Sequence, residues 1–138
     1  MPGSFLDTNV LVYLVSEDQV KADRAEAIVR EGGVISVQVL NELTNVARRK
    51  MRMTWPNIHA LLSTLRGLLT VQSITIETHE TGLGLAERYG LSTYDAMIAA
   101  SALLADCDVL WSEDMQDGMA LSDGLRIVNP FRDKNLGK

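Results

Sequence analysis

Residues 3–15 read GSFLDTNVLVYLV, and within them one acidic residue lies between two apolar segments. Asp7 directly follows Phe5 and Leu6 and shortly precedes Val10. The pattern predicts a short strand that ends at Leu6 and a helix from Val10 onward, so Asp7 stands at a strand-to-helix junction. A buried, unpaired carboxylate is strongly unfavourable. Asp7 is therefore either a helix cap or part of a charged site, and its local sequence leaves both interpretations open.

The composition is that of an ordinary globular protein, with 46% hydrophobic and 22% charged residues among 138. We expect one domain covering residues 1–138. The longest apolar runs, such as 96–105, are too short to span a bilayer, so we expect a soluble protein with no membrane partner. Cys107 is the only cysteine and no secretory leader is recognisable, which favours the cytoplasm.

The formal net charge of −5 argues against a polyanionic partner, because contacts to phosphate rely on lysine and arginine. The distribution of charge softens this argument, since four cationic residues form a local basic patch: Arg48, Arg49, Lys50 and Arg52. The patch has two interpretations. Its residues either stabilise the end of a helix through the helix dipole or contact the backbone of a nucleic acid.

Predicted strands and helices alternate along the chain. The predicted strands cover residues 4–6, 34–37, 71–76, 109–111 and 125–128. The predicted helices cover residues 21–30, 38–50, a segment starting near Pro56, a segment capped by Thr78 and ending before Gly90, and a segment capped by Ser92. This alternation predicts an α/β protein of three layers, α/β/α, with a central, mostly parallel sheet of about five strands.

Three further acids stand near places that a parallel sheet would bring to one edge, where ligands bind in such folds. Glu42 lies at the border of the apolar face of its helix and has no cation three or four residues away, which weakens a simple ion-pair interpretation. Asp95 lies in the first turn of an apolar helix and also fits a loose capping box with Ser92. Asp114 follows the strand at 109–111, where acid-rich turns are usually solvated loops.

Clustered carboxylates repel one another, so four acids at one edge require a cation or protons. The plausible ligands are hard oxygens, and neither His59 nor His79 has a metal-ligand spacing with an acid or with Cys107. This ligand chemistry favours Mg²⁺ or Mn²⁺. The expected reaction is metal-assisted hydrolysis of a phosphodiester.

Four segments of the chain carry a resemblance to a known family, and they occur in that family's order. They are FLDTNVLVY at 5–13, ISVQVLNEL at 35–43, LSTYDAMIAASA at 91–102 and LWSEDMQDG at 110–118. The sequence resembles a PIN-domain ribonuclease, and in particular the VapC-type toxins of toxin-antitoxin modules. The resemblance implies a PIN-like three-layer fold and a metal-dependent endoribonuclease.

The resemblance also implies a set of site residues. The acidic quartet, which would bind one or two Mg²⁺ or Mn²⁺ ions, is Asp7, Glu42, Asp95 and Asp114. The supporting polar residues are Thr8, Asn9 and Ser112. Glu113 and Asp117 are alternatives for the fourth acid, and Asp114 is preferred because the family pattern places the acid two residues after a strand-end serine or threonine.

The partners that the resemblance implies are an RNA substrate, a second copy of the chain in a homodimer, and a cognate VapB-like antitoxin. The C-terminal segment of that antitoxin would occupy the groove near the acids and direct a basic side chain to them. In this context the basic patch at 48–52 becomes a candidate contact for the RNA backbone.

Two other functions compete with this interpretation. The segment DTNV at 7–10 approximates the DxDxV signature of haloacid-dehalogenase-like phosphatases, but Asn9 replaces the second aspartate and cannot transfer its proton. A non-catalytic PIN-like binding module would hold a structural cation or recruit a partner with the same acids. Cleavage of RNA by the wild type and by an Asp7→Asn variant distinguishes the three functions.

Overall fold

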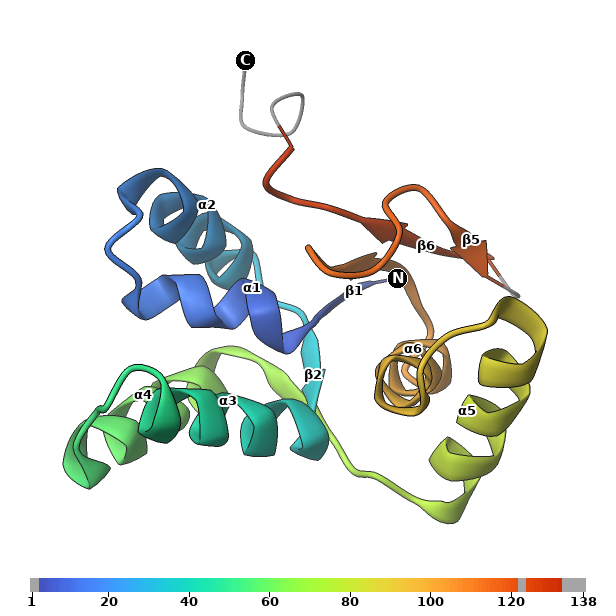
Figure 1. The fold of residues 1–138 in the computed structure, drawn as a ribbon, viewed down its shortest axis with the longest axis horizontal. Helices are drawn as coiled ribbons and strands as arrows, with labels where there is room; N and C mark the ends of the chain where they lie inside the picture. The colour runs from blue at the N-terminus through green and yellow to red at the C-terminus, as the bar shows by residue number, and fades with distance from the viewer. Residues whose placement is uncertain (1–2, 122–123, 133–138) are drawn as a thin grey trace.

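The computed structural model describes residues 3–121 and 124–132, and it forms an α/β fold around one sheet (Figure 1). The strands are β1 (Gly3–Leu6), β2 (Val34–Ser36), β3 (Thr70–Gln72), β4 (Cys107–Trp111), β5 (Ala120–Leu121) and β6 (Leu125–Val128). The helices are α1 (Thr8–Val12), the 3₁₀ helix η1 (Tyr13–Val15), α2 (Gln19–Arg30), α3 (Val37–Arg49), α4 (Trp55–Leu68), α5 (Ile76–Tyr89) and α6 (Thr93–Leu104).

The sheet has the strand order β3-β2-β1-β4-β6-β5, and all pairs are parallel except the antiparallel pair β5 and β6. The predicted fold class, with its mostly parallel sheet, is confirmed. The sheet has six strands within the described residues, one more than predicted. The additional strand, β5, contains only two residues, which is too short to produce a recognisable alternation in the sequence.

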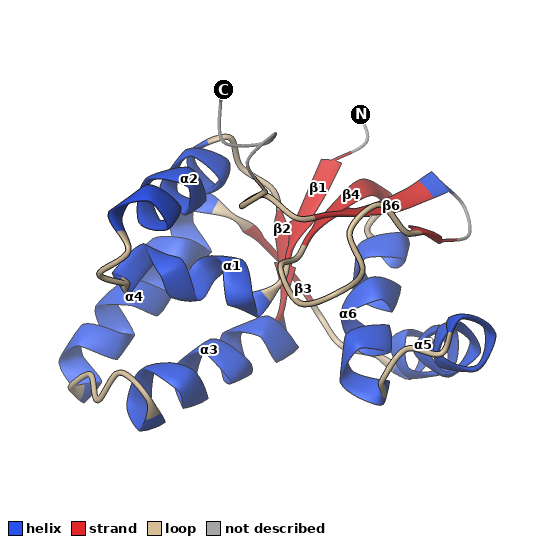
Figure 2. Cartoon of the chain, turned by 45° about the horizontal axis from the view of Figure 1, so that its top comes forward, coloured by secondary structure: helices blue, strands red, loops and turns tan. Residues whose placement is uncertain are grey.

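Helices cover both faces of the sheet and complete the three layers (Figure 2). Helices α1 to α4 lie on one face, and α5 and α6 lie on the other. Helix α6 is buried along almost its whole length, from Ala96 to Ala102. In the described part of the chain, no helix combines the length and the apolar character needed to cross a membrane.

The order of the strands creates a switch point between β1 and β4. From β1 the chain proceeds to β2 and β3 on one side, and it then crosses to β4 and β6 on the other. Leu6 of β1 pairs with Trp111 of β4, and the backbone N–H of Asp7 donates to the carbonyl of Trp111 at 3.0 Å. The residues that follow these two strands are therefore adjacent at the edge where α/β folds bind ligands.

The apolar segments around Asp7 are part of the hydrophobic core. Phe5 and Leu6 precede it, Val10 and Leu11 follow it, and all four are fully buried. Helix α1 begins at Thr8, two residues before the predicted start, because Asp7 caps it. Asp7 is thus fixed on both sides by buried chain.

The predicted bounds that differ most from the structure are those of the strand over 71–76. The strand predicted over 71–76 ends at Gln72, and Ile76 already belongs to α5. The cap of this helix is Thr75 rather than Thr78. The two threonines form a reciprocal capping box, in which the Thr75 hydroxyl accepts from the Thr78 N–H at 3.2 Å and the Thr78 hydroxyl accepts from the Thr75 N–H at 3.1 Å. Because both threonines can cap a helix, the predicted start of α5 lies about one turn too late.

The other predicted helix signals are confirmed. Ser92 caps α6, and Gly90 ends α5 in the left-handed conformation, with φ of 72°. The apolar face predicted for the helix over 38–50 contains the buried residues of α3, which are Val39, Leu43 and Ala47. This packing turns the opposite face of α3 toward solvent, including its basic C-terminal end.

Candidate active site

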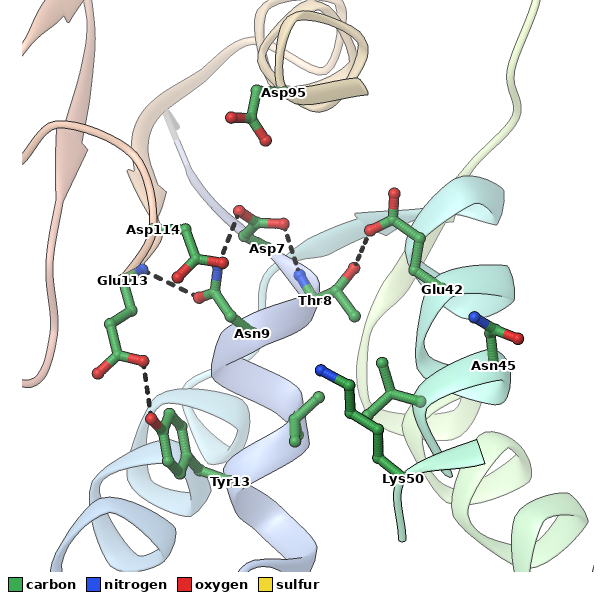
Figure 3. Close-up of a pocket in the computed structure, with 12 residues that line it drawn as sticks. Asp7, Thr8, Asn9, Tyr13, Glu42, Asn45, Lys50, Asp95, Glu113 and Asp114 are labelled. Carbon is green, nitrogen blue, oxygen red and sulfur yellow. Dashed lines mark hydrogen bonds between the residues drawn. The ribbon is translucent and has the colours of Figure 1, made fainter. Parts of the chain in front are cut away.

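A cavity of about 490 Å³ opens at the carboxyl edge of β1 and β4 (Figure 3). Four elements contribute one predicted acid each to its wall: the end of β1, α3, the start of α6 and the loop after β4. The acids are Asp7, Glu42, Asp95 and Asp114. The structure therefore brings together all four carboxylates, although the chain separates the first from the last by more than a hundred residues.

Asp7 is the most buried of these acids, with 5% of its surface exposed. Its Oδ1 accepts the backbone N–H of Thr8 at 2.7 Å, and its Oδ2 accepts the Ser112 hydroxyl at 2.8 Å and the Asn9 amide at 3.1 Å. The carboxylate thus caps α1 and also belongs to the acid cavity, so the two interpretations of its local sequence are compatible. The Thr8, Ser112 and Asn9 groups that contact its carboxylate are all hydrogen-bond donors, and they fix its orientation.

The electrostatic environment of Asp7 is unfavourable for its charge. Burial raises the pKa of Asp7 from 3.8 to about 6, the hydrogen bonds from Ser112 and Thr8 partly oppose this, and the charges of Asp95 and Glu42 raise it further. Burial is therefore the main obstacle to ionisation of Asp7, and the hydrogen bonds offset it only in part.

Glu42 is half-buried and is held from two sides. Its Oε1 accepts the hydroxyl of Thr8 at 2.6 Å, and its Oε2 accepts the side-chain amide of Gln38 at 3.0 Å. Thr8 thereby links the first two acids, because its backbone N–H binds Asp7 while its hydroxyl binds Glu42. The partners of Glu42 are neutral, consistent with the absence of a nearby cation along its own helix.

Asp95 lies in the first turn of α6, where its backbone N–H donates to the hydroxyl of Ser92 at 3.2 Å. Burial raises the pKa of Asp95, a hydrogen bond with Ser92 lowers it, and the charges of Asp114 and Glu42 raise it. The shifts of Asp7 and Asp95 share a cause, since each carboxyl group is desolvated and faces other acids of the same cavity.

The loop after β4 contains the three candidates for the fourth acid, and the structure separates their surroundings. Asp114 is exposed and lines the cavity. Asp117 forms an ion pair with Arg132 at 2.9 Å and accepts the backbone N–H of Asn129 at 2.7 Å. Asp117 does not appear among the residues that line the acid cavity.

Glu113 also borders the cavity, but its carboxylate is engaged elsewhere. It pairs with Lys21 at 2.6 Å and accepts the hydroxyl of Tyr13 at 2.7 Å, while its backbone N–H donates to the Asn9 side chain at 2.9 Å. This network fastens the loop to α1, η1 and α2 and leaves Asp114 facing the cavity (Figure 3). Tyr13 and Lys21 were not predicted as partners of Glu113, because both are distant from it along the chain.

The four basic residues of the patch occupy different positions. Lys50 lines the acid cavity and points into it (Figure 3). Arg48 and Arg49 line a neighbouring cavity of about 550 Å³. Arg52 is exposed in the turn after α3, with φ of 54°, and lines neither cavity. The patch therefore begins inside the acid cavity and continues along the C-terminal end of α3.

The donor set fits a hard divalent cation. Among the described residues, no three histidine, cysteine, aspartate or glutamate side chains converge closely enough to form a ready-made metal cluster. The acids nevertheless present oxygen ligands to one cavity. Burial first, and then the charges of the neighbouring acids, raise the pKa values of Asp7 and Asp95, and a bound cation would favour the ionised form of both. Carboxylate oxygens of this kind suit Mg²⁺ or Mn²⁺.

A mostly parallel sheet with a cavity lined by acids at its carboxyl edge defines an α/β protein with a candidate metal-dependent site. Comparison with known proteins identifies its family. The family model for the PIN domain matches residues 4–118, so the chain belongs to the PIN domain family. The predicted PIN-like identity is confirmed. No curated protein sequence matches the chain.

Several solved structures share the fold. A toxin-antitoxin complex from Klebsiella pneumoniae aligns with a TM-score of 0.71 at 23% identity, covering 93% of this chain and 98% of the other. The toxin VapC20 of Mycobacterium tuberculosis, which cleaves the sarcin-ricin loop, aligns with a TM-score of 0.66 at 17% identity, covering 80% and 89%. DNA-bound VapBC from Salmonella typhimurium aligns with a TM-score of 0.64 at 22% identity, covering 92% and 97%. At these identities the likeness is one of fold.

Proposed function

We propose that this protein is an endoribonuclease that depends on Mg²⁺ or Mn²⁺ and acts as the toxin of a VapBC-type toxin-antitoxin pair. The observation that carries the proposal is that four carboxylates from four elements line one cavity of a PIN domain. The fold shared with VapC20 and with other toxin-antitoxin structures supports the toxin assignment. We take residues 1–138 as one PIN domain, because the buried residues form one core cluster.

In this proposal Asp7 and Asp95 are the principal ligands of the cation, and Glu42 and Asp114 complete the set directly or by orienting water. When bound, a divalent cation would stabilise negative charge on the phosphate and make water a better nucleophile. Ser112, Asn9 and the backbone of Thr8 hold the Asp7 carboxylate in one orientation. The Thr8 hydroxyl does the same for Glu42.

The basic patch at 48–52, which includes Lys50 in the acid cavity, would bind the RNA backbone. Lys50 lines the acid cavity and points its ammonium group into it from the side of Thr8, where it would meet a phosphate bound beside the acids. Arg48 and Arg49 extend this positive charge along α3, and Arg52 adds to it from the following turn. Local charge of this kind allows an acidic protein to bind a polyanion, because phosphate contacts depend on nearby cations.

The test is the cleavage of a panel of structured RNAs with Mg²⁺ or Mn²⁺, with and without chelator. We expect cleavage that chelator abolishes and that an Asp7→Asn variant lacks. Asp108→Asn is the matched control, because Asp108 is an exposed aspartate of β4 that does not line the cavity. Cleavage that Asp7→Asn leaves unchanged would refute the mechanism.

The same experiment separates the competing functions. Failure to cleave any RNA would favour a non-catalytic binding module. Release of phosphate from small phosphomonoesters would favour the phosphatase, but the structure supports this function poorly. Asn9 donates its amide to Asp7 and is therefore a hydrogen-bond donor to the acid rather than a proton shuttle.

The proposed partners follow from the toxin assignment. The Klebsiella structure is a toxin-antitoxin complex, and the Salmonella structure is DNA-bound VapBC. We propose that a VapB-like antitoxin inhibits this protein by placing a basic side chain among the four acids. Replacing that side chain by alanine should abolish inhibition of RNA cleavage. We also propose a homodimer in the cytoplasm, for which light scattering should give twice the mass of the chain.

A further inference from the structure

The second cavity has a composition that the acid site does not explain. Its wall consists of polar and basic side chains of α3 together with one aromatic ring from the start of α4. The residues are Asn41, Thr44, Asn45, Arg48, Arg49 and Trp55. Asn45 also lines the acid cavity, so the two cavities are adjacent along α3.

The spacing along α3 sets the distance between the two cavities. Glu42, Asn45 and Arg49 are separated by three and four residues, so they lie on one side of the helix. From Glu42 to Arg49 the helix rises by about 10 Å. An extended RNA strand whose phosphate lies among the acids would therefore place a neighbouring nucleotide over the second cavity.

Trp55 is the unusual member of this wall. About half of its surface, 51%, is exposed, whereas tryptophan side chains are on average highly buried. The guanidinium carbon of Arg48 lies 4.6 Å from the centre of its ring. A hydrogen bond at 3.2 Å from Arg48 to the carbonyl of Met53 holds the guanidinium in place. The result is a fixed flat surface at the end of the basic patch.

We propose that the Arg48–Trp55 pair is a stacking platform for an unpaired base of the RNA, next to the nucleotide whose phosphate is cleaved. Flat aromatic rings and guanidinium planes are the surfaces on which proteins stack unpaired bases. The Arg48 guanidinium contacts the Trp55 ring and donates to the Met53 carbonyl. Of the two arginines that line this cavity, Arg49 is therefore the one placed to contact phosphate. The amides of Asn41 and Asn45 face the same cavity and offer donors and acceptors to the base edge.

This inference rests on the proposed function for the choice of RNA as the ligand, and the chain provides a direct readout. It contains two tryptophans, Trp55 and Trp111. Trp111 is partly buried at the end of β4, and its ring lies under Arg24 at 5.5 Å. A Trp111→Phe variant therefore reports on Trp55 alone, and a Trp55→Phe variant reports on Trp111 alone.

The experiment titrates both variants with single-stranded oligoadenylate in an Asp7→Asn background with Mg²⁺, which keeps the RNA intact. We expect quenching of Trp55 emission and no change in Trp111 emission. An oligonucleotide of the same length without bases, which keeps the phosphates, should leave Trp55 unchanged. Equal quenching by the abasic strand or by duplex RNA, quenching by an acidic peptide instead, or no quenching at all would overturn the proposal.

Affinity measurements with labelled oligoadenylate provide a second readout. We expect Trp55→Ala to weaken binding about tenfold and Trp55→Phe, which keeps a ring, to weaken it much less. Arg48→Lys keeps the charge and loses the plane, so it should weaken binding severalfold, whereas Arg30→Lys on α2 should have no effect. Equal affinity for Trp55→Ala and the wild type would also overturn the proposal.

The failure of this inference is distinguishable from that of the proposed function. If the wild type cleaves RNA but Trp55 does not respond to oligoadenylate, the platform is refuted and the ribonuclease stands. If Trp55 responds and no RNA is cleaved with either cation, the platform stands and the protein is an RNA-binding module.

Discussion

The acid cavity and the basic C-terminal end of α3 carry opposite charges although they are neighbours, and they are built differently. The acids come from four separated elements and are oriented by specific hydrogen bonds, as those of Asp7 illustrate. The cations are almost consecutive in the sequence and lie on the exposed end of one helix. The difference indicates that the function of the acid cavity depends on the exact positions of its side chains. The function of the basic patch depends mainly on how much positive charge it carries.

Removing one acid should produce the largest effect, because the cavity acts as a unit. We expect Asp95→Asn to lower the rate of RNA cleavage by about 1000-fold, since a cation that loses one ligand stabilises the charged phosphate less. The measurement is the single-turnover rate at saturating protein, with Asp108→Asn as the control. A fall in the cleavage rate of less than about tenfold would mean that Asp95 only supports the N-terminal cap of α6 and does not bind the cation.

The free energy of unfolding of the metal-free protein should show how unfavourable the ionised form of Asp7 is in the folded state. The pKa of Asp7 is raised from 3.8 to about 6 in the folded state, so folding takes up a proton between these values. The contribution of Asp7 to stability therefore falls as the pH rises through this window, by about 3 kcal/mol in total. Asp7→Asn should be more stable than the wild type at pH values above 6 and similar to it below 3.8.

This pH dependence is measured by denaturant unfolding in chelator, comparing the two proteins across the window. Adding Mg²⁺ or Mn²⁺ at neutral pH should stabilise the wild type and leave Asp7→Asn largely unchanged, because a ligand that binds the folded state raises its stability. Parallel pH profiles for the two proteins would contradict the assignment of the raised pKa to Asp7.

The residues that orient Asp7 should matter less than the acids themselves. Ser112→Ala removes the hydroxyl that donates to the Asp7 carboxylate and anchors the N–H of Met115. We expect the apparent affinity for Mg²⁺ or the cleavage rate to fall by between about 10-fold and about 100-fold. Ser112→Thr, which keeps a hydroxyl, should recover part of the loss. An unchanged metal dependence in Ser112→Ala would show that Asp7 needs no support from the loop after β4.

The basic end of α3 should respond in affinity rather than in the chemical step. We expect Arg49→Glu to raise KM for RNA about tenfold, to change kcat little and to reduce the salt dependence of binding by about one phosphate contact. Arg66→Glu is the matched control, because Arg66 is exposed at the end of α4 and lines neither cavity. Equal salt dependence in Arg49→Glu and Arg66→Glu would remove the basic patch from the RNA path.

The same contrast explains what the sequence could predict. The basic patch was visible directly, because its members are neighbours in the chain. Asp7, Glu42 and Asp114 were recognisable because each follows a strand or lies on the helix after one, and parallel strands bring such positions together. Asp95 lies on α6, which follows the helix α5, and it was recognised from its place in the first turn of an apolar helix and from the family resemblance. The order of strands across the sheet does not follow from any local pattern.

The parts that could not be predicted depend on contacts over long distances in the sequence. The engagement of Glu113 by Lys21 and Tyr13 separates it from Asp114, yet no spacing rule links residues so far apart. The pairing of Arg48 with Trp55 requires the turn between α3 and α4, whose geometry includes the left-handed residue Arg52. Such contacts are settled by tertiary packing.

The central claim is that the four acids hold the cation on which RNA cleavage depends. Its most direct test is the cleavage rate of one RNA as a function of Mn²⁺ concentration, at constant ionic strength, for the wild type and Asp7→Asn. For the wild type we expect a cleavage rate that rises with Mn²⁺ concentration and saturates. Chelator should abolish this cleavage, and added Mn²⁺ should restore it. For Asp7→Asn we expect a cleavage rate that stays at background at every Mn²⁺ concentration. Cleavage that persists in chelator, or identical curves for the two proteins, would contradict the central claim.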